Sequence, residues 1–89
     1  MRNFTCLEVY CNLNDEWASK REISKNIEST KKEPIVGRET LKYDLKWLVE
    51  IGLAEKRLVF YEFKGKEICE PQYRLARNQN HFQDRRIAG

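Results

Sequence analysis

Histidine, cysteine and proline are scarce in this chain of 89 residues. Its single histidine, His81, lies in a polar C-terminal stretch, and its three cysteines, Cys6, Cys11 and Cys69, show no paired spacing. A zinc site needs four soft ligands, usually as closely spaced pairs, so the sequence predicts no metal site. An odd number of unpaired cysteines is typical of free thiols in a reducing compartment rather than of a disulfide framework.

Catalytic motifs are missing as well. The sequence contains no glycine-rich phosphate-binding loop and no nucleophile motif, and its carboxylates are interspersed with lysine and arginine at spacings typical of a surface. We therefore expect neither an enzyme nor a bound cofactor.

Long apolar runs are also absent. No segment approaches the roughly 20 apolar residues that span a bilayer. The N-terminal Met1-Arg2-Asn3 is not followed by an apolar run of the length found in signal peptides. These features predict a cytoplasmic protein without a membrane partner.

The chain is instead rich in charged and aromatic residues. It is 35% charged and 40% hydrophobic, with two Trp, four Phe and four Tyr, which is enough for one folded domain. A domain of this size buries only about 60% of its unfolded surface, so a homodimer would add to its stability. We expect the dimer surface on the first helix and the C-terminal tail, through Phe4, Tyr10, Phe82 and Ile87.

Positive charge is concentrated in the middle of the chain. Residues 20–46 carry eight basic and five acidic groups, whereas residues 1–19 carry one basic and three acidic groups. Such a distribution would attract a polyanion to the central segment. A solvated surface of mixed charge is an equally compatible interpretation.

Hydrophobic periodicity predicts two helices in the first third of the chain. Residues 3–13 have apolar side chains at helical spacing. Trp17-Ala18 then predicts a minimal strand with Trp17 in the core. Ser19, with Glu22 three residues later, has the pattern of a capping box and predicts the start of a second helix over 20–28. The apolar seam of that helix consists only of Ile23 and Ile27.

A loop and a third helix follow. Residues 29–36 include Pro34, which cannot continue a helix, so they predict a loop. The third helix runs from Gly37 to about residue 51, and its apolar stripe consists of Leu41, Leu45 and Leu48. Gly52 supplies a left-handed position that ends the helix, and Leu53 can fold back on its last turn.

The C-terminal part predicts a β-hairpin and a tail. Residues 53–63 are rich in aromatic and β-branched side chains, 64–66 form a Lys-Gly-Lys turn signal, and 67–75 return as a second strand. Pro71 in that strand is compatible only with a sheet edge or a bulge. Residues 76–89 are polar and predict a loosely held, flexible tail.

This order of helix, short strand, helix, loop, helix and hairpin resembles the winged helix-turn-helix superfamily. The resemblance is carried by Trp17-Ala-Ser-Lys-Arg-Glu-Ile23 and by Gly37-Arg38-Glu39-Thr40-Leu41 with the leucines and Gly52-Leu53 that follow. It implies an α+β fold, a three-helix winged helix-turn-helix domain over 1–75 with a C-terminal β-hairpin wing. The loop before the third helix is longer than the three or four residues usual in a helix-turn-helix.

The resemblance further implies a small DNA-binding transcriptional regulator, of a prokaryote, an archaeon or their viruses and mobile elements, acting on double-stranded DNA. The third helix would enter the major groove and the wing tip would touch the backbone. Arg38 is the candidate for reading a guanine, unless it is solvated or pairs with Glu39 or Asp44. The other candidate DNA-contacting residues are Glu39, Lys42, Tyr43, Lys46, Lys64, Lys66, Lys20 and Arg21.

A winged-helix module that binds protein, such as a viral inhibitor or an assembly adaptor, is the alternative. The net charge of only +3 and the acidic groups among the basic ones favour it. Tyr43 and Trp47, with Glu39, would then form the contact surface. Trp47 is otherwise expected to pack under the hairpin or the long loop.

Overall fold

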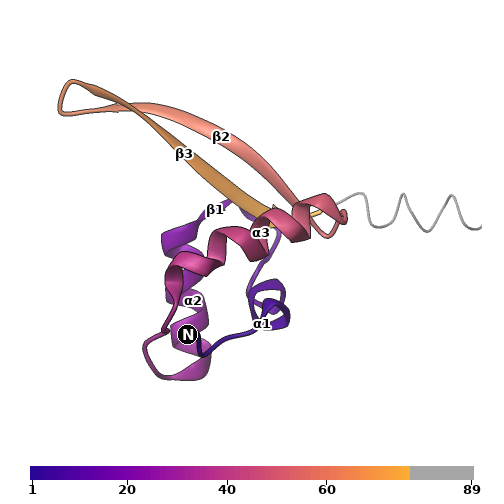
Figure 1. Cartoon of the computed structure of the whole chain (residues 1–89). Helices are drawn as coiled ribbons and strands as arrows, with labels where there is room; N and C mark the ends of the chain where they lie inside the picture. The colour runs from indigo at the N-terminus through magenta and orange to yellow at the C-terminus, as the bar shows by residue number, and fades with distance from the viewer. Residues whose placement is uncertain (77–89) are drawn as a thin grey trace, which may run out of the picture.

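The computed structural model describes residues 1–76 and contains three α-helices and a three-stranded antiparallel sheet. The expected combination of helices with a C-terminal antiparallel hairpin is confirmed. Figure 1 shows the helices gathered below the base of the hairpin, which projects from them. The elements in chain order are α1 (Cys6–Cys11), β1 (Ala18–Ser19), α2 (Lys20–Lys31), the 3₁₀ turn η1 (Arg38–Thr40), α3 (Leu41–Glu50), β2 (Ala54–Phe63) and β3 (Lys66–Leu75).

The hydrophobic core lies between the three helices and the base of the hairpin. Its fully buried members include Val9, Ile23 and Ile27, together with the predicted stripe of Leu41, Leu45 and Leu48. Ala54 and Tyr73 are the buried contributions of β2 and β3. The outer half of the hairpin therefore extends beyond the core that stabilises its base.

The first helix is shorter than the predicted 3–13. Thr5 caps it by accepting a hydrogen bond from the Glu8 N–H, and the Glu8 carboxylate accepts one from the Thr5 N–H in return. Phe4, just before this cap, is buried in the core. Its assignment to a dimer surface is therefore wrong, and Phe82 and Ile87 lie outside the described residues.

The second helix begins as predicted and ends later. The Ser19 hydroxyl accepts from the Glu22 N–H at 3.2 Å, and the Glu22 carboxylate accepts from the Ser19 N–H at 2.9 Å. The helix continues past residue 28 to Lys31, because Pro34 restricts only Glu33 directly. Lys32 ends it in a left-handed conformation with φ of 62°.

The third helix has a tight first turn and a regular end. Gly37 has φ of 84°, and the turn after it is 3₁₀ rather than α-helical. At the other end, the Leu53 N–H donates to the Leu48 carbonyl at 2.9 Å and the Gly52 N–H donates to the Val49 carbonyl at 3.1 Å. With Gly52 at φ 85°, this is a Schellman motif, which confirms the predicted stop.

Trp17 does not lie in the core, contrary to the prediction. Its ring is half-buried, with the Arg57 and Arg74 guanidinium carbons 4.6 and 4.3 Å from its centroid. Side chains alternate between the two faces of a strand, and Arg57 points away from the face that carries the buried Ala54. Trp17 therefore covers the outer face of the sheet.

The hairpin is long and uninterrupted. β2 and β3 pair from Ala54 opposite Leu75 to Phe63 opposite Lys66, without a change of register. Lys64 and Gly65 both have positive φ, which matches the twist of a two-residue hairpin loop.

β3 is the middle strand, in the order β1-β3-β2. The prediction of an edge strand at Pro71 is therefore wrong for the strand as a whole. β1 pairs only with Gln72 and Tyr73, so at Pro71 β3 is hydrogen-bonded on one side at most, which is the environment a residue without an N–H tolerates.

The described fold includes Ala76, which is buried and whose N–H donates to the Leu53 carbonyl at 3.1 Å. The rest of the predicted tail lies outside the described residues. Within residues 1–76, no helix has the length and apolar character needed to cross a bilayer.

Candidate nucleic-acid interface

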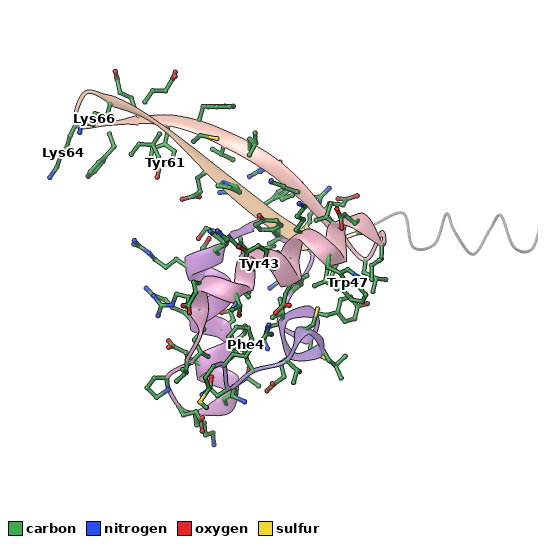
Figure 2. The ribbon with its side chains drawn as sticks, in the orientation of Figure 1. Phe4, Tyr43, Trp47, Tyr61, Lys64 and Lys66 are labelled. Atoms are coloured by element: carbon green, nitrogen blue, oxygen red, sulfur yellow. The ribbon has the colours of Figure 1, made fainter. Side chains whose placement is uncertain are left out.

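An open groove of about 410 Å³ lies between the exposed side of α3 and the base of the hairpin. Three lysines line it, two from α3 and one from β2, together with two tyrosines. The lining residues are Lys42, Tyr43, Lys46, Val49, Glu50, Lys56 and Tyr73. Figure 2 shows Tyr43 on the side of α3 that faces the hairpin.

Helix and strand periodicity together bring the lysines to this groove. Lys42 and Lys46 each follow a buried leucine of α3 by one residue and are four residues apart, so they share one flank of the helix. Lys56 is two residues after the buried Ala54 and points to the same face of β2. Its register partner is Tyr73, whose burial raises the pKa of the phenol above its usual value.

The groove has an excess of positive charge. Four ion pairs occur within residues 1–76, and none involves Lys42, Lys46 or Lys56. The Lys42 ammonium nitrogen lies 5.1 Å from the centroid of the Tyr43 ring. Glu50 is the acidic residue in the lining, so the groove carries three ammonium groups against one carboxylate. Such a site favours an anionic ligand.

Arg38 is exposed at the start of this helix. Its guanidinium Nη2 lies 3.8 Å from Oε2 of Glu28, and 62% of its side chain is accessible. The same Glu28 oxygen accepts a hydrogen bond from the Ile35 N–H at 3.0 Å. An exposed pair of this kind contributes about 0–1 kcal/mol, so Arg38 can exchange it for another partner at little cost.

Arg38 pairs with Glu28 and not with Glu39 or Asp44, the two partners that the sequence suggests. Asp44 is held by the Arg2 guanidinium through hydrogen bonds from both of its terminal nitrogens. Glu39 is exposed and takes part in none of the ion pairs found between residues 1 and 76. Its carboxylate on the outer side of η1 opposes the approach of phosphate there and limits the electropositive surface.

Tyr43 and Trp47 are both exposed, at 63% and 52%. The prediction that Trp47 packs under the hairpin or the loop is wrong. Trp47 is not a lining residue of the groove, and Ile51, four residues further along the chain, is also exposed. Tyr43 therefore belongs to the basic groove, whereas Trp47 belongs to a separate apolar surface at the end of α3.

The remaining predicted contacts do not reach the groove. Figure 2 shows Lys64 and Lys66 at the far tip of the hairpin, remote from Tyr43. Lys20 and Arg21 are exposed at the start of α2 and do not line the groove. The structure thus brings together Lys42, Tyr43 and Lys46 from the predicted set, with Arg38 on the preceding turn.

Sequence reasoning missed Lys56. Strand alternation alone predicts that Lys56 shares a face with Ala54, but it does not predict that this face lies against α3. Tyr73 was missed in the same way, since only the register of the hairpin places it opposite Lys56.

Comparison of the chain with protein-family models, curated proteins and solved structures gave no match. The residues described by the structure also include no cluster of His, Cys, Asp and Glu that could hold a metal ion. The basic groove and the surfaces beside it are therefore the features of this chain that bear on its function.

Proposed function

We propose that this protein is a winged helix-turn-helix regulator of transcription that binds double-stranded DNA. In this proposal α3 and η1 enter the major groove, the hairpin is the wing, and the groove between them receives a phosphate strand. The observation that carries it is the convergence of Lys42, Lys46 and Lys56 on one groove without an acid partner in the described ion pairs.

The dimensions of α3 suit the major groove of B-DNA. A helix with its side chains is about 10–12 Å across, and the major groove is about 12 Å wide. Residues at the N-terminal end of such a helix reach base edges first. That end carries the exposed Arg38, whose planar guanidinium matches guanine O6 and N7.

The lysines have a different role in this arrangement. An ammonium group is a point charge on a flexible stem and contacts phosphate without reading sequence. Lys42 and Lys46 on α3 and Lys56 on β2 would hold the backbone strand from two sides. Tyr43 between them offers a hydroxyl and a ring edge to sugar or phosphate.

The wing reaches further along the duplex. Lys64 is eight residues beyond Lys56, which corresponds to about 26 Å of extended strand. The rise of one DNA turn is about 34 Å, so the tip with Lys64 and Lys66 would contact backbone in the neighbouring groove. Regulation would follow from occupancy of the promoter by this domain.

Fluorescence anisotropy with labelled duplex DNA of mixed sequence at low salt tests the proposal. We expect binding by the wild-type chain and a loss of at least tenfold in affinity for Lys42→Ala/Lys46→Ala/Lys56→Ala. Lys25→Ala is the matched control, because Lys25 is an exposed lysine of α2 outside the groove. Absence of binding, or equal binding by the triple variant, contradicts the proposal.

The exposed Trp47 and Ile51 favour a second candidate function, a module that binds protein. Its contact surface would run along the exposed side of η1 and α3, from Glu39 and Tyr43 to Trp47. Trp47→Ala should then abolish capture of a host protein that survives nuclease treatment, while Lys56→Ala leaves the capture unchanged. Loss of capture after nuclease treatment would favour DNA instead.

A further inference from the structure

Within residues 1–76, no strand pairs with the outer edge of β2 between Lys56 and Phe63. β2 is the last strand in the order β1-β3-β2, and it pairs with β3 along one side only. Its apolar side chains are largely accessible, with Leu58 at 51%, Phe60 at 62%, Tyr61 at 43% and Phe63 at 55%. Between Lys56 and Phe63, backbone donors and acceptors without a strand partner in the described residues lie next to apolar side chains, which is a template for another strand.

This edge has neither a proline nor a bulge, which are two of the usual protections against pairing. β2 contains neither proline nor glycine, and its register with β3 is continuous over all ten residues, so no bulge twists the edge away. Residues 58–61 are four consecutive uncharged, apolar or aromatic side chains. Lys56 and Arg57 precede this segment and Glu62 follows it. The positions of these charges determine which register a partner strand can adopt.

We propose that a second copy of this chain pairs antiparallel with the outer edge of β2, about a twofold axis at Val59. A twofold axis perpendicular to a sheet keeps every side chain on its own face. Opposed residues must therefore both have even numbers, on the face of the buried Ala54, or both odd numbers, on the face of Arg57 and Trp17.

The register centred on Val59 matches charge with charge and apolar with apolar for the two even-numbered pairs between residues 56 and 62. Lys56 lies opposite Glu62 of the partner subunit, and Leu58 lies opposite Phe60 of the partner subunit. On the other face Arg57 lies opposite Tyr61 of the partner subunit. Each of these pairs occurs twice by symmetry, and opposite-charge and aromatic cross-strand pairs both stabilise a sheet.

The neighbouring symmetric registers are less favourable. Centring the pairing on Phe60 places Lys56 opposite Lys64 of the partner subunit, which is repulsive. Centring it on Leu58 places Glu62 opposite Ala54 of the partner subunit and leaves the carboxylate without its lysine. Only the Val59 register gives each charge between residues 56 and 62 an attractive partner.

Pairing also completes a structure that is marginal by itself. The hairpin beyond its buried base is a two-stranded ribbon, which is barely stable in water. The dimer would contain a six-stranded sheet in the order β1-β3-β2-β2-β3-β1. The helices of the two copies would then lie at opposite ends of this sheet. Lys56, which lines the basic groove, would also face Glu62 of the partner subunit, whereas Lys42 and Lys46 on α3 take no part in the strand pairing.

A charge exchange at the two ends of the register tests the proposal. Lys56→Glu makes positions 56 and 62 both acidic, and Glu62→Lys makes them both basic. Because these two positions face each other in the proposed dimer, each variant alone should repel its own copy and have the mass of a single chain in light scattering. An equimolar mixture should have the mass of two chains, because the acidic positions 56 and 62 of one variant then face the basic positions 62 and 56 of the other. A mixture that stays at the mass of one chain overturns the proposal, as does a wild-type chain that stays monomeric at millimolar concentration.

Cysteine cross-linking tests the register independently. In a Cys11→Ser/Cys69→Ser parent, which removes the two exposed thiols, Val59→Cys should oxidise to a covalent dimer. Directly opposed antiparallel residues have Cα atoms about 4.5–5.5 Å apart, within the range of a disulfide. Tyr61→Cys is the matched control, since its copies would be four residues, about 13 Å, apart. Equal cross-linking at both positions, or none at Val59→Cys, overturns the register.

Discussion

Lys42 and Lys56 line the same groove although one belongs to α3 and the other to β2. Neither is among the ion-paired residues of the described part of the chain. Ammonium groups that share a groove repel each other, and a phosphate between them would replace repulsion with attraction. The groove is therefore better matched to a polyanion than to solvent.

The salt dependence of DNA binding should change at Lys56. A phosphate contact contributes about −0.9 to the slope of log affinity against log salt. Lys56→Ala should therefore reduce the magnitude of that slope by about 0.9 and weaken binding to all sequences alike. Anisotropy titrations at several salt concentrations measure it. Lys25→Ala should keep the wild-type slope. An unchanged slope for Lys56→Ala would show that Lys56 does not contact a phosphate.

Arg38 should control sequence preference rather than general affinity. Arg38→Ala is expected to cost about 1–3 kcal/mol on the preferred sequence at one guanine and to flatten the preference there. Arg38→Lys keeps the charge and loses the planar fork, so it should lose the same preference. Selection of binding sites from a random duplex library, repeated with each variant, measures this. If Arg38→Lys keeps the full preference, another residue recognises the guanine.

Gly37 should be the glycine most sensitive to substitution. A Cβ at this position would lie 2.6 Å from the Met1 carbonyl oxygen and 2.7 Å from the Arg2 Cβ, in addition to the cost of a positive φ. Gly52 has nearly the same φ, 85° against 84°, and nothing within 4 Å of its added Cβ. Both alanine variants should lose about 1–2 kcal/mol for the left-handed conformation. Gly37→Ala should lose more, as measured by urea unfolding, and equal losses would contradict the close approach.

Acid should destabilise the protein partly through Glu8. The side-chain hydrogen bond from Lys31, together with the backbone hydrogen bond from Thr5, lowers the pKa of the Glu8 carboxyl. A carboxyl with a lowered folded-state pKa stabilises the fold above its unfolded pKa, and this contribution is lost as the pH falls through the folded pKa. Below about pH 4.3, the ordinary glutamate value, the wild-type chain should therefore lose more stability than Glu8→Gln.

Urea unfolding at a series of pH values measures this difference. Glu16→Gln is the control, because Glu16 is an exposed carboxylate outside the lysine-lined groove and belongs to none of the ion pairs within residues 1–76. It should show the acid sensitivity of the wild type. Parallel curves for the wild type and Glu8→Gln would show that the Lys31 contact does not contribute.

Local signals were sufficient to predict most of the helical part. The leucine stripe of α3, the capping box of Ser19 and Glu22 and the stop at Gly52 are contacts between residues close in sequence, and the structure contains all of them. The turn at Lys64 and Gly65 is local as well. Such features follow from periodicity and backbone conformation alone.

Features set by pairing between distant segments were not predictable. The apolar ring of Trp17 predicts a core residue. It is instead covered by the guanidinium groups of Arg57 and Arg74, which are distant from it in the sequence. The place of Lys56 in the groove depends on where the hairpin meets α3. Phe4 is predicted on a dimer surface of the first helix, yet it is buried in the core of the single chain.

Amide chemical-shift mapping of the labelled protein with duplex DNA tests the central claim most directly, because it locates the contact surface. The account predicts shifts concentrated on residues 38–46, around Lys56 and at the hairpin tip of Lys64 and Lys66, with little change in α1. Shifts confined to Trp47 and Ile51, or spread evenly over α1 and the back of α2, would contradict it.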